Sequence, residues 1–228
     1  KKDLAEIGRI ARLYKIRLTM HPSQFNVLSN WENPKVLENT IKDLRMHTDI
    51  LNMMELDQDS ICVIHGGGIY NNKPKAIETF IKNFNSLDED IRNRLVIENC
   101  ERCYNIEDML YISENTGAPV IFDTHHYNCY KICNKDRKSA LLLKEAKEYI
   151  PQILETWIRR GIKPKFHISE QRPGERIGAH RNFVECIPEY LLEIPKKYGI
   201  DVDIMIEAKF KEKAVFHLYK KYPQLSPF

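Results

Sequence analysis

The sequence predicts an α/β fold in which parallel strands alternate with helices, a TIM-type (β/α)8 barrel. Short apolar, β-branched runs alternate with longer segments of helical periodicity, which is the pattern of parallel strands joined by right-handed crossovers. Each run also carries, at or near its end, a residue able to bind a metal. A barrel collects such residues from many strand ends, whereas a doubly wound sheet gathers its site at one switch point. The length of 228 residues, 43% of them hydrophobic, suits one sizeable core, so we expect one domain over residues 1–228.

Six runs are predicted to be strands because they are short, apolar and rich in β-branched residues. They are Ile16–His21, Ser60–His65, Arg94–Glu98, Pro119–Asp123, Pro164–Ser169 and Val202–Glu207. Six strands do not close a standard barrel, and the sequence opens on a helix that should follow a strand. We therefore expect the first two βα units to be missing, so that the chain is a partial barrel domain. An unusually open barrel is the alternative.

Six longer segments carry apolar residues at three- and four-residue spacing and are predicted to be helices. In the second of them, Leu37, Ile41 and Leu44 share one face. The six segments are Leu4–Tyr14, Pro34–Leu56, Pro74–Leu87, Ile106–Thr116, Ser139–Arg160 and Asn182–Tyr198. Each lies before or between predicted strands, as the alternation requires.

The composition excludes several classes of protein. No apolar run approaches the length of a membrane span and the sequence opens without a signal-peptide core, so we expect no membrane contact and a cytoplasmic location. The formal charge of +3 is too small to diagnose a nucleic-acid binder, although metal-bound carboxylates would leave the remaining surface more basic. The six scattered cysteines are expected to be reduced thiols.

Two pairs of cysteines lie close together in the sequence, Cys100 with Cys103 and Cys129 with Cys133. They can be drawn as a four-cysteine zinc site. The pairs are loose and belong to separate loops, so unpaired cysteines near a metal-rich rim are the favoured interpretation.

Histidines and carboxylates collect where the predicted strands end. Six of the eight histidines lie at or just past the ends of apolar runs, and three carboxylates occupy the same kind of place. These residues are His21, His65, His125, His126, His167, His180, Glu98, Asp123 and Glu207. Histidines with purely structural roles would not gather at equivalent strand ends, so the pattern predicts a polynuclear metal site.

Mixed imidazole and carboxylate ligands suit zinc, manganese or iron rather than calcium, which prefers cages of oxygen atoms. Clusters of two or three such ions commonly hydrolyse phosphate esters. The alternative is a hydrogen-bonded polar rim without metal. It is disfavoured because so many buried charges would need to be neutralised.

The motifs at these residues resemble, in order, those of the UV damage endonucleases. They are His21-Pro-Ser-Gln-Phe25, His65-Gly-Gly, Glu98-Asn, Phe122-Asp-Thr-His-His126, Lys165-Phe-His-Ile-Ser169, Ala179-His-Arg-Asn-Phe183 and Glu207-Ala-Lys-Phe-Lys211. The resemblance covers nearly the whole chain. It implies a xylose isomerase-like barrel that cuts damaged double-stranded DNA immediately 5′ of UV photoproducts and related lesions, leaving a 3′-hydroxyl. It also implies a monomer without an obligate protein partner, acting at the nucleoid or, in a eukaryote, in the nucleus.

The resemblance further implies three metal ions, usually Mn²⁺, with Zn²⁺ or another divalent ion as the alternative. The three ligand sets are His21, His65 and Glu98; then Glu98, Asp123, His167 and Glu207; then His126 and His180 with Lys165 as a carboxylated side chain. Lys165, Glu98 and His65 are the implied catalytic residues. A carboxylated lysine is an anionic ligand, which would explain a buried lysine on the same strand face as His167. An ordinary ammonium paired with Glu98 or Glu207 remains the alternative.

The same resemblance assigns lesion probing to Gln24 and Phe25, an amide and an aromatic that can fill a gap in the base stack. Phe25 as a simple loop anchor is the alternative. Cationic residues close to the motifs are candidates to hold DNA phosphates. They are Arg172, Arg176, Arg181 and Lys209.

Three other functions stay open. The endonuclease IV family, which cuts at abasic sites, has a similar ligand order, but its third metal uses an aspartate where this chain has Gly178. Sugar isomerases and epimerases also place His, Glu and Asp ligands at a barrel rim, with one or two ions and no need of a wedge such as Phe25. A non-catalytic DNA-binding protein would bind damaged duplexes without cutting them.

Overall fold

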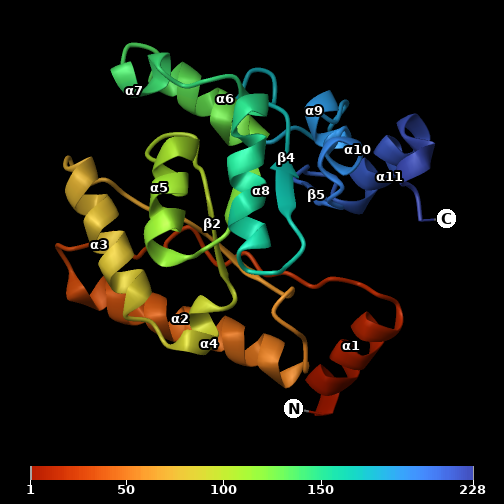
Figure 1. The fold of residues 1–228 in the computed structure, drawn as a ribbon, viewed down its shortest axis with the longest axis horizontal. Helices are drawn as coiled ribbons and strands as arrows, with labels where there is room; N and C mark the ends of the chain where they lie inside the picture. The colour runs from red at the N-terminus through yellow and green to blue at the C-terminus, as the bar shows by residue number, and fades with distance from the viewer. Residues whose placement is uncertain (1, 228) are drawn as a thin grey trace.

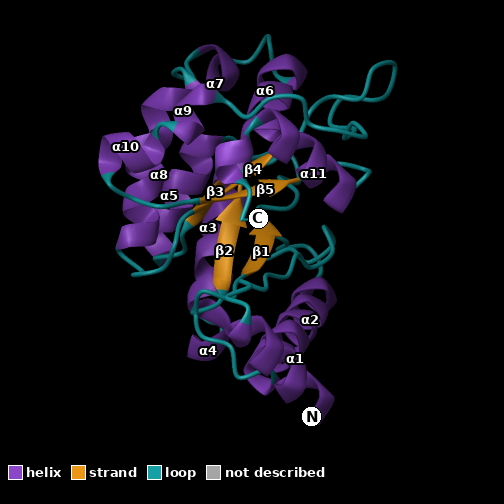
Figure 2. Ribbon diagram, turned by 90° about the vertical axis from the view of Figure 1, so that its right-hand side faces the viewer, coloured by secondary structure: helices purple, strands orange, loops and turns teal. Residues whose placement is uncertain are grey.

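A parallel sheet forms the centre of the protein in a computed structural model that describes residues 2–227 (Figure 1). Its strands follow the order β1-β2-β3-β4-β5, and the helices lie around them (Figure 2). The strands are β1 (Cys62–His65), β2 (Leu95–Glu98), β3 (Val120–Asp123), β4 (Lys165–Ile168) and β5 (Asp203–Ile206). Consecutive strands are neighbours throughout, as the predicted βα alternation requires.

The strand register aligns the residues that end the strands. His65 on β1 pairs with Glu98 on β2, and Asp123 on β3 pairs with His167 on β4. Parallel strands expose their carboxyl ends at one edge of the sheet, so these side chains meet there. The sheet is therefore the element that assembles the predicted ligands.

The helices connect the strands and cover the sheet. They are α1 (Lys2–Leu13), α2 (Pro34–Met53), α3 (Lys73–Asn85), α4 (Glu89–Arg92), α5 (Ile106–Thr116), α6 (Thr124–Cys133), α7 (Lys138–Leu141), α8 (Ile150–Ile158), α9 (Glu189–Leu192), α10 (Ile194–Tyr198) and α11 (Glu212–Lys221). In Figure 1, α6 and α7 lie at the opposite end of the molecule from α1, α2 and α4. No helix within residues 2–227 is both long and apolar enough to cross a membrane.

Asparagine caps explain where the long helices begin. The side chains of Asn33, Asn72 and Asn105 accept backbone N–H groups at the starts of α2, α3 and α5. Asp108 completes a capping box with Asn105, and Gly117 closes α5 in the left-handed conformation. Such caps satisfy backbone groups that have no partner within the helix. The predicted bounds of α5 are confirmed at both ends.

The predicted strand Ile16–His21 is wrong. Only Met20 pairs, through a parallel bridge to Cys62, with Met20 N–H bonded to the Ile61 carbonyl at 2.9 Å. Instead, the Arg17 side chain donates to the Asp59 carbonyl at 2.6 Å and to Asp203 at 2.8 Å. Within residues 2–227, the segment Ile16–His21 lies at the edge of the sheet and has β1 as its one hydrogen-bonded neighbour strand. The Arg17 contacts hold it in place without a continuous series of backbone hydrogen bonds to β1.

Two predicted helices are shorter and broken. The segment Ser139–Arg160 divides into α7, a 3-10 turn at Ala146–Tyr149, and α8. The segment Asn182–Tyr198 is helical only in α9 and α10, which begin beside Pro188 and Pro195. Proline lacks an N–H and restricts the residue before it, so helices begin rather than continue there. The helix α6, which follows the β3 residue Asp123 at once, was not predicted.

Candidate metal centre

Glu98 is the centre of the cluster at the carboxyl ends of the strands. It ends β2 and is fully buried. One carboxylate oxygen lies 2.9 Å from Nδ1 of His167 and 3.7 Å from Nδ1 of His126. The other lies 3.2 Å from Nε2 of His21 and 3.7 Å from Nε2 of His65. Burial acts to raise the pKa of Glu98, but the surrounding histidines, His167 foremost, hold it well below its usual range.

Asp123 and His126 are brought together by the start of α6. The Asp123 side chain accepts the backbone N–H of His126 at 2.7 Å and so caps this helix. One turn of helix then places the His126 ring between Asp123 and Glu98, 3.7 Å from an oxygen of each. Burial raises the pKa of Asp123 to about 6. The Asn99 side chain, which accepts from Asp123 N–H at 2.9 Å, ties the ends of β2 and β3 together.

Glu207 extends the cluster toward the open side. Its carboxylate lies 3.1 Å from Nδ1 of His167 and 3.8 Å from Nδ1 of the half-buried His180. Burial lowers the pKa of His167, but Glu98 and Glu207 together raise it to about 10. The His180 ring lies 6.1 Å from that of His126, centre to centre. The third predicted pair of histidines therefore lies together at the rim.

The cluster can hold metal ions. Three groups have ligand atoms within 4.8 Å of one another: His21, His65 and Glu98; Glu98, Asp123 and His126; and Glu98, His167 and Glu207. Three atoms among them, His65 Nδ1, Asp123 Oδ2 and His167 Nε2, are buried without a hydrogen-bond partner. Buried polar atoms are almost always paired. Imidazole and carboxylate ligands with unsatisfied atoms fit a first-row divalent metal.

Lys165 lies apart from this cluster. It is buried, and its amine donates to the Thr19 hydroxyl at 2.6 Å. Within residues 2–227 it forms no ion pair with Glu98 or Glu207 and no hydrogen bond to His126 or His180. Burial lowers the pKa of Lys165 to about 8. In a minority of the molecules, the Lys165 amine is therefore uncharged near neutral pH.

A cleft of about 650 Å³ opens beside the cluster. His65, His126 and His180 lie on its wall, with Gln24 and Phe25 at its edge. Phe25 is 78% exposed, which excludes the loop-anchor interpretation because an anchor would be buried. Sequence reasoning missed Glu101 and Arg102, which also line the cleft. Their position one residue after the Glu98-Asn99 motif was the available signal.

The predicted phosphate-binding cations are not equivalent. Arg176 lines the cleft. Arg181 is held by Glu170 at 3.0 Å, whereas Arg172 and Lys209 are exposed. The four-cysteine zinc site is not assembled, because no candidate metal group within residues 2–227 contains a cysteine. His125 belongs to none of the three candidate metal groups found within residues 2–227, although its ring lies 5.8 Å from that of His180, centre to centre. Its Nε2 atom lies 3.6 Å from Cys129 Sγ.

Comparison with known proteins identifies what the chain is similar to. A family model described as UV-endonuclease UvdE matches residues 1–227. The chain is 37% identical to a putative UV-damage endonuclease of Acanthamoeba polyphaga mimivirus, covering 97% of the chain and 65% of that protein. It is 32% identical to a UV DNA damage endonuclease of Bacillus pumilus, covering 97% of the chain and 66% of that protein. The chain thus spans about two thirds of the length of these relatives.

Solved structures confirm the predicted TIM-type fold class. The crystal structure of SacUVDE superposes with a TM-score of 0.77 at 30% identity, covering 97% of this chain and 71% of that chain. A D-tagatose 3-epimerase-like protein superposes with a TM-score of 0.68 at 19% identity, covering 98% of this chain and 83% of that chain. Endonuclease IV from Thermus thermophilus superposes with a TM-score of 0.61 at 16% identity, covering 97% of this chain and 82% of that chain. The last two likenesses, at such low identity, show the fold alone.

Proposed function

The chain belongs to the UV-endonuclease UvdE family, and on that premise we propose that it is a metal-dependent DNA repair endonuclease. It cleaves the phosphodiester immediately 5′ of UV photoproducts and related lesions and leaves a 3′-hydroxyl. The observation that carries the proposal is the position of Glu98. One buried carboxylate is shared by three groups of candidate metal ligands beside an open cleft. The proposed partner is damaged double-stranded DNA, bound by a monomer.

The proposed cofactor is a cluster of three Mn²⁺ ions, with Zn²⁺ as the alternative. The proposed ligand sets are His21, His65 and Glu98; Glu98, Asp123, His167 and Glu207; and His126, His180 and Lys165. The first set is a group that the structure brings together, and the second contains such a group in Glu98, His167 and Glu207. In this structure, by contrast, His126 lies with Glu98 and Asp123, and Lys165 bonds to Thr19. Bound divalent ions of this kind supply a nucleophile from water near neutral pH and stabilise charge on phosphate oxygens. Glu98, His65 and Lys165 are the proposed catalytic residues.

The chain's own residues position the reacting groups. Glu98 is held between His167 and His21, so its two oxygens face different ligand groups. Asp123 is fixed by α6 and by Asn99. Rigid ligands of this kind keep a phosphate in one geometry, which is the main contribution a protein makes to such a displacement.

Lys165 is proposed to be carboxylated. The neutral amine attacks carbon dioxide, a C–N bond forms, and one amine proton is released to water. The pKa of Lys165, lowered by burial to about 8, leaves neutral amine available for this step. The product is a carbamate, whose single negative charge is shared by two oxygen atoms beyond Nζ. This would supply the carboxylate that Gly178 does not offer to His126 and His180.

Gln24 and Phe25 are the proposed lesion probes. Phe25 is an exposed aromatic at the edge of the cleft, where no packing role holds it. Damaged base pairs stack poorly, so unstacking them costs less, and the difference selects lesions without reading sequence. Arg176 faces the cleft, and Arg172 and Lys209 are exposed cations available to phosphates. Phosphate contacts fix the register of a duplex on a protein.

Nicking of end-labelled duplexes tests the proposed function. The duplexes carry a pyrimidine dimer, an abasic site or no lesion, each with and without Mn²⁺. A metal-dependent cut just 5′ of the dimer is expected. Cutting of the abasic duplex alone would assign an endonuclease IV-like activity, and binding without cutting by the metal-loaded protein would assign a non-catalytic role. A content of one or two ions per chain, with no cutting, would favour a sugar isomerase.

A further inference from the structure

Cys100 and Cys103 lie against each other in a tight loop after β2. The loop closes on itself, since Cys100 N–H donates to the Tyr104 carbonyl at 2.9 Å. The backbone N–H groups of Cys103 and Tyr104 both donate to Cys100 Sγ at 3.2 Å. The backbone of Cys103 thus contacts the sulfur of Cys100. The two side chains also form a hydrogen bond with each other, so a bond between the two sulfurs needs only a local movement.

The two thiols also lie on the wall of the cleft. All six cysteines are free. Cys100 is 9% exposed and Cys103 is half-buried, so a small oxidant in the cleft reaches Cys103 first. The exposed thiols Cys133 and Cys186 are reachable as well. Neither forms a hydrogen bond with another cysteine among residues 2–227, so neither is held against a second sulfur as Cys103 is.

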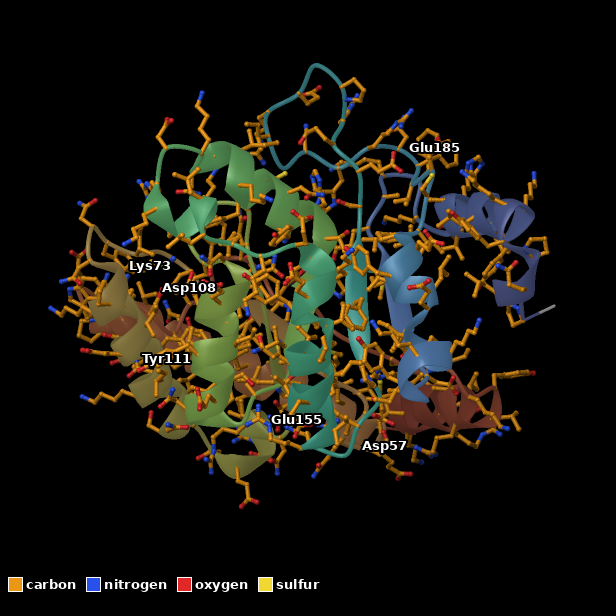
Figure 3. The ribbon with its side chains drawn as sticks, turned by 45° about the horizontal axis from the view of Figure 1, so that its top comes forward. Asp57, Lys73, Asp108, Tyr111, Glu155 and Glu185 are labelled. Atoms are coloured by element: carbon orange, nitrogen blue, oxygen red, sulfur yellow. The ribbon has the colours of Figure 1, made fainter. Side chains whose placement is uncertain are left out.

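The hydrogen bond from Cys100 favours the thiolate of Cys103. It lowers the pKa of Cys103 to about 7, with smaller contributions from Lys73 and Arg102, whereas burial and Glu101 act to raise this pKa. Lys73 is fixed at the start of α3 by an ion pair with Asp108 at 2.5 Å (Figure 3). Its amine also lies 5.9 Å from the centre of the Tyr104 ring. A partly accessible cysteine beside fixed cations is the environment in which thiols become reactive.

We propose that Cys100 and Cys103 are a redox-active pair that hydrogen peroxide converts to an intramolecular disulfide. The Cys103 sulfur attacks one peroxide oxygen, the O–O bond breaks, and the leaving hydroxide takes a proton to become water. The Cys100 sulfur then attacks the resulting sulfenic acid, the S–O bond breaks, and the leaving hydroxide takes the Cys100 proton as a second water. Two thiols are oxidised and one peroxide is reduced to two waters.

The bridge changes the wall of the cleft. Glu101 and Arg102 lie between the two cysteines in the chain and line the cleft with them. Glu101 also packs toward Gly178, where a Cβ added to the glycine would lie 3.2 Å from Glu101 Cγ. Drawing Cys103 onto Cys100 moves these two charged side chains. Resting on the proposed function, we infer that oxidation weakens binding of the lesion duplex.

Peptide mapping tests the disulfide without any activity assay. The reduced protein is exposed to hydrogen peroxide, blocked with N-ethylmaleimide and cut with trypsin, which cleaves after Arg94 and Arg102. The expected product is a linked pair of Leu95–Arg102 with Cys103–Lys131. Because Cys129 lies in the second peptide, the pair must persist in Cys129→Ser and disappear in Cys103→Ser. The proposal would be overturned if both peptides carried N-ethylmaleimide while Cys133 or Cys186 was oxidised. Cys100 and Cys103 would then have stayed free thiols under conditions that oxidise other cysteines.

Fluorescence anisotropy with a dimer-containing duplex tests the link to the cleft. Oxidised protein is expected to bind at least about threefold more weakly, with recovery in dithiothreitol and no response in Cys103→Ser. The exposed Cys133→Ser variant is the matched control and should respond like the unchanged chain. A disulfide that leaves affinity unchanged contradicts this link. A chain that forms the disulfide but binds no duplex, reduced or oxidised, contradicts the proposed function instead.

Discussion

Replacing Glu98 by glutamine is the sharpest test of the metal centre. Glutamine keeps the shape of the side chain but removes the charge shared by the three candidate ligand groups. Glu98 is fully buried, so solvent cannot compensate for the change. We expect the variant to lose bound metal and, with it, nicking activity.

The structure also sets the expected change in stability of the metal-free protein. The pKa of Glu98 is held well below its usual range, so the charged form contributes stability above the pKa of the unfolded chain. That stability is lost as pH falls through the pKa of the folded protein. The two closest bonds join Glu98 to His167 at 2.9 Å and to His21 at 3.2 Å. A hydrogen bond to a charged group contributes about 1–1.5 kcal/mol more to stability than a neutral one. With two such bonds weakened, Glu98→Gln should lower the free energy of unfolding by about 2–3 kcal/mol at neutral pH.

Two measurements check these values. Urea unfolding in EDTA, followed by fluorescence of the buried Trp157, gives the free energy of unfolding. Elemental analysis after dialysis against Mn²⁺ gives the ions bound per chain. Glu101→Gln is the matched control, because Glu101 lies in the following loop and forms no hydrogen bond or ion pair within residues 2–227. A Glu98→Gln protein that keeps its full metal content would refute the shared-carboxylate reasoning.

Three further outcomes are expected. Burial lowers the pKa values of His126 and His167, but the neighbouring carboxylates outweigh it and raise them to about 9 and about 10. The stability that these histidines contribute is complete below their pKa in the unfolded chain and is lost as pH rises through their pKa values in the folded protein. The Tm in EDTA should therefore fall between about pH 6.5 and 10. A Tm that does not change over this range would contradict the reasoning. Lys165→Arg, which keeps the positive charge of an unmodified lysine but cannot be carboxylated, should bind one ion fewer and lose the ¹³C carbamate signal from labelled bicarbonate; three ions in this variant would contradict the ligand role of a carboxylated Lys165. Phe25→Ala should lower the preference for damaged over intact duplex by about 1–3 kcal/mol in competition binding. Its Tm should not change because Phe25 is 78% exposed, and Phe25→Trp should keep the preference.

Short-range patterns predicted helices where caps agree with periodicity. The bounds of α5 follow from the Asn105 cap and Gly117, both readable from the sequence. The same periodicity failed over Ser139–Arg160, where apolar residues at helical spacing belong to several short elements. Spacing reports which residues face a core, but not whether one continuous helix carries them.

The strand prediction failed where pairing decides the outcome. Ile16–His21 has the composition of a strand, yet Met20 alone pairs with β1. A strand exists only through its neighbours, and a local apolar run does not contain that information. Helix α6 was not predicted for a related reason. Asp123 is both the last residue of β3 and the residue whose side chain caps α6, so no loop separates the two elements in the sequence.

The sequence by itself determined the order of the ligands and, for His65, Glu98 and Asp123, their place at the strand ends, because strand periodicity and parallel connections are local rules. Only the tertiary structure decided that Glu98 serves three ligand groups, that Lys165 bonds to Thr19, and that a cysteine pair lines the cleft. The contact of Glu98 with His167 spans 69 residues, and that of Lys165 with Thr19 spans 146. Contacts at such separations depend on how the sheet curves and on which side chains reach across it. No local pattern of residues specifies either.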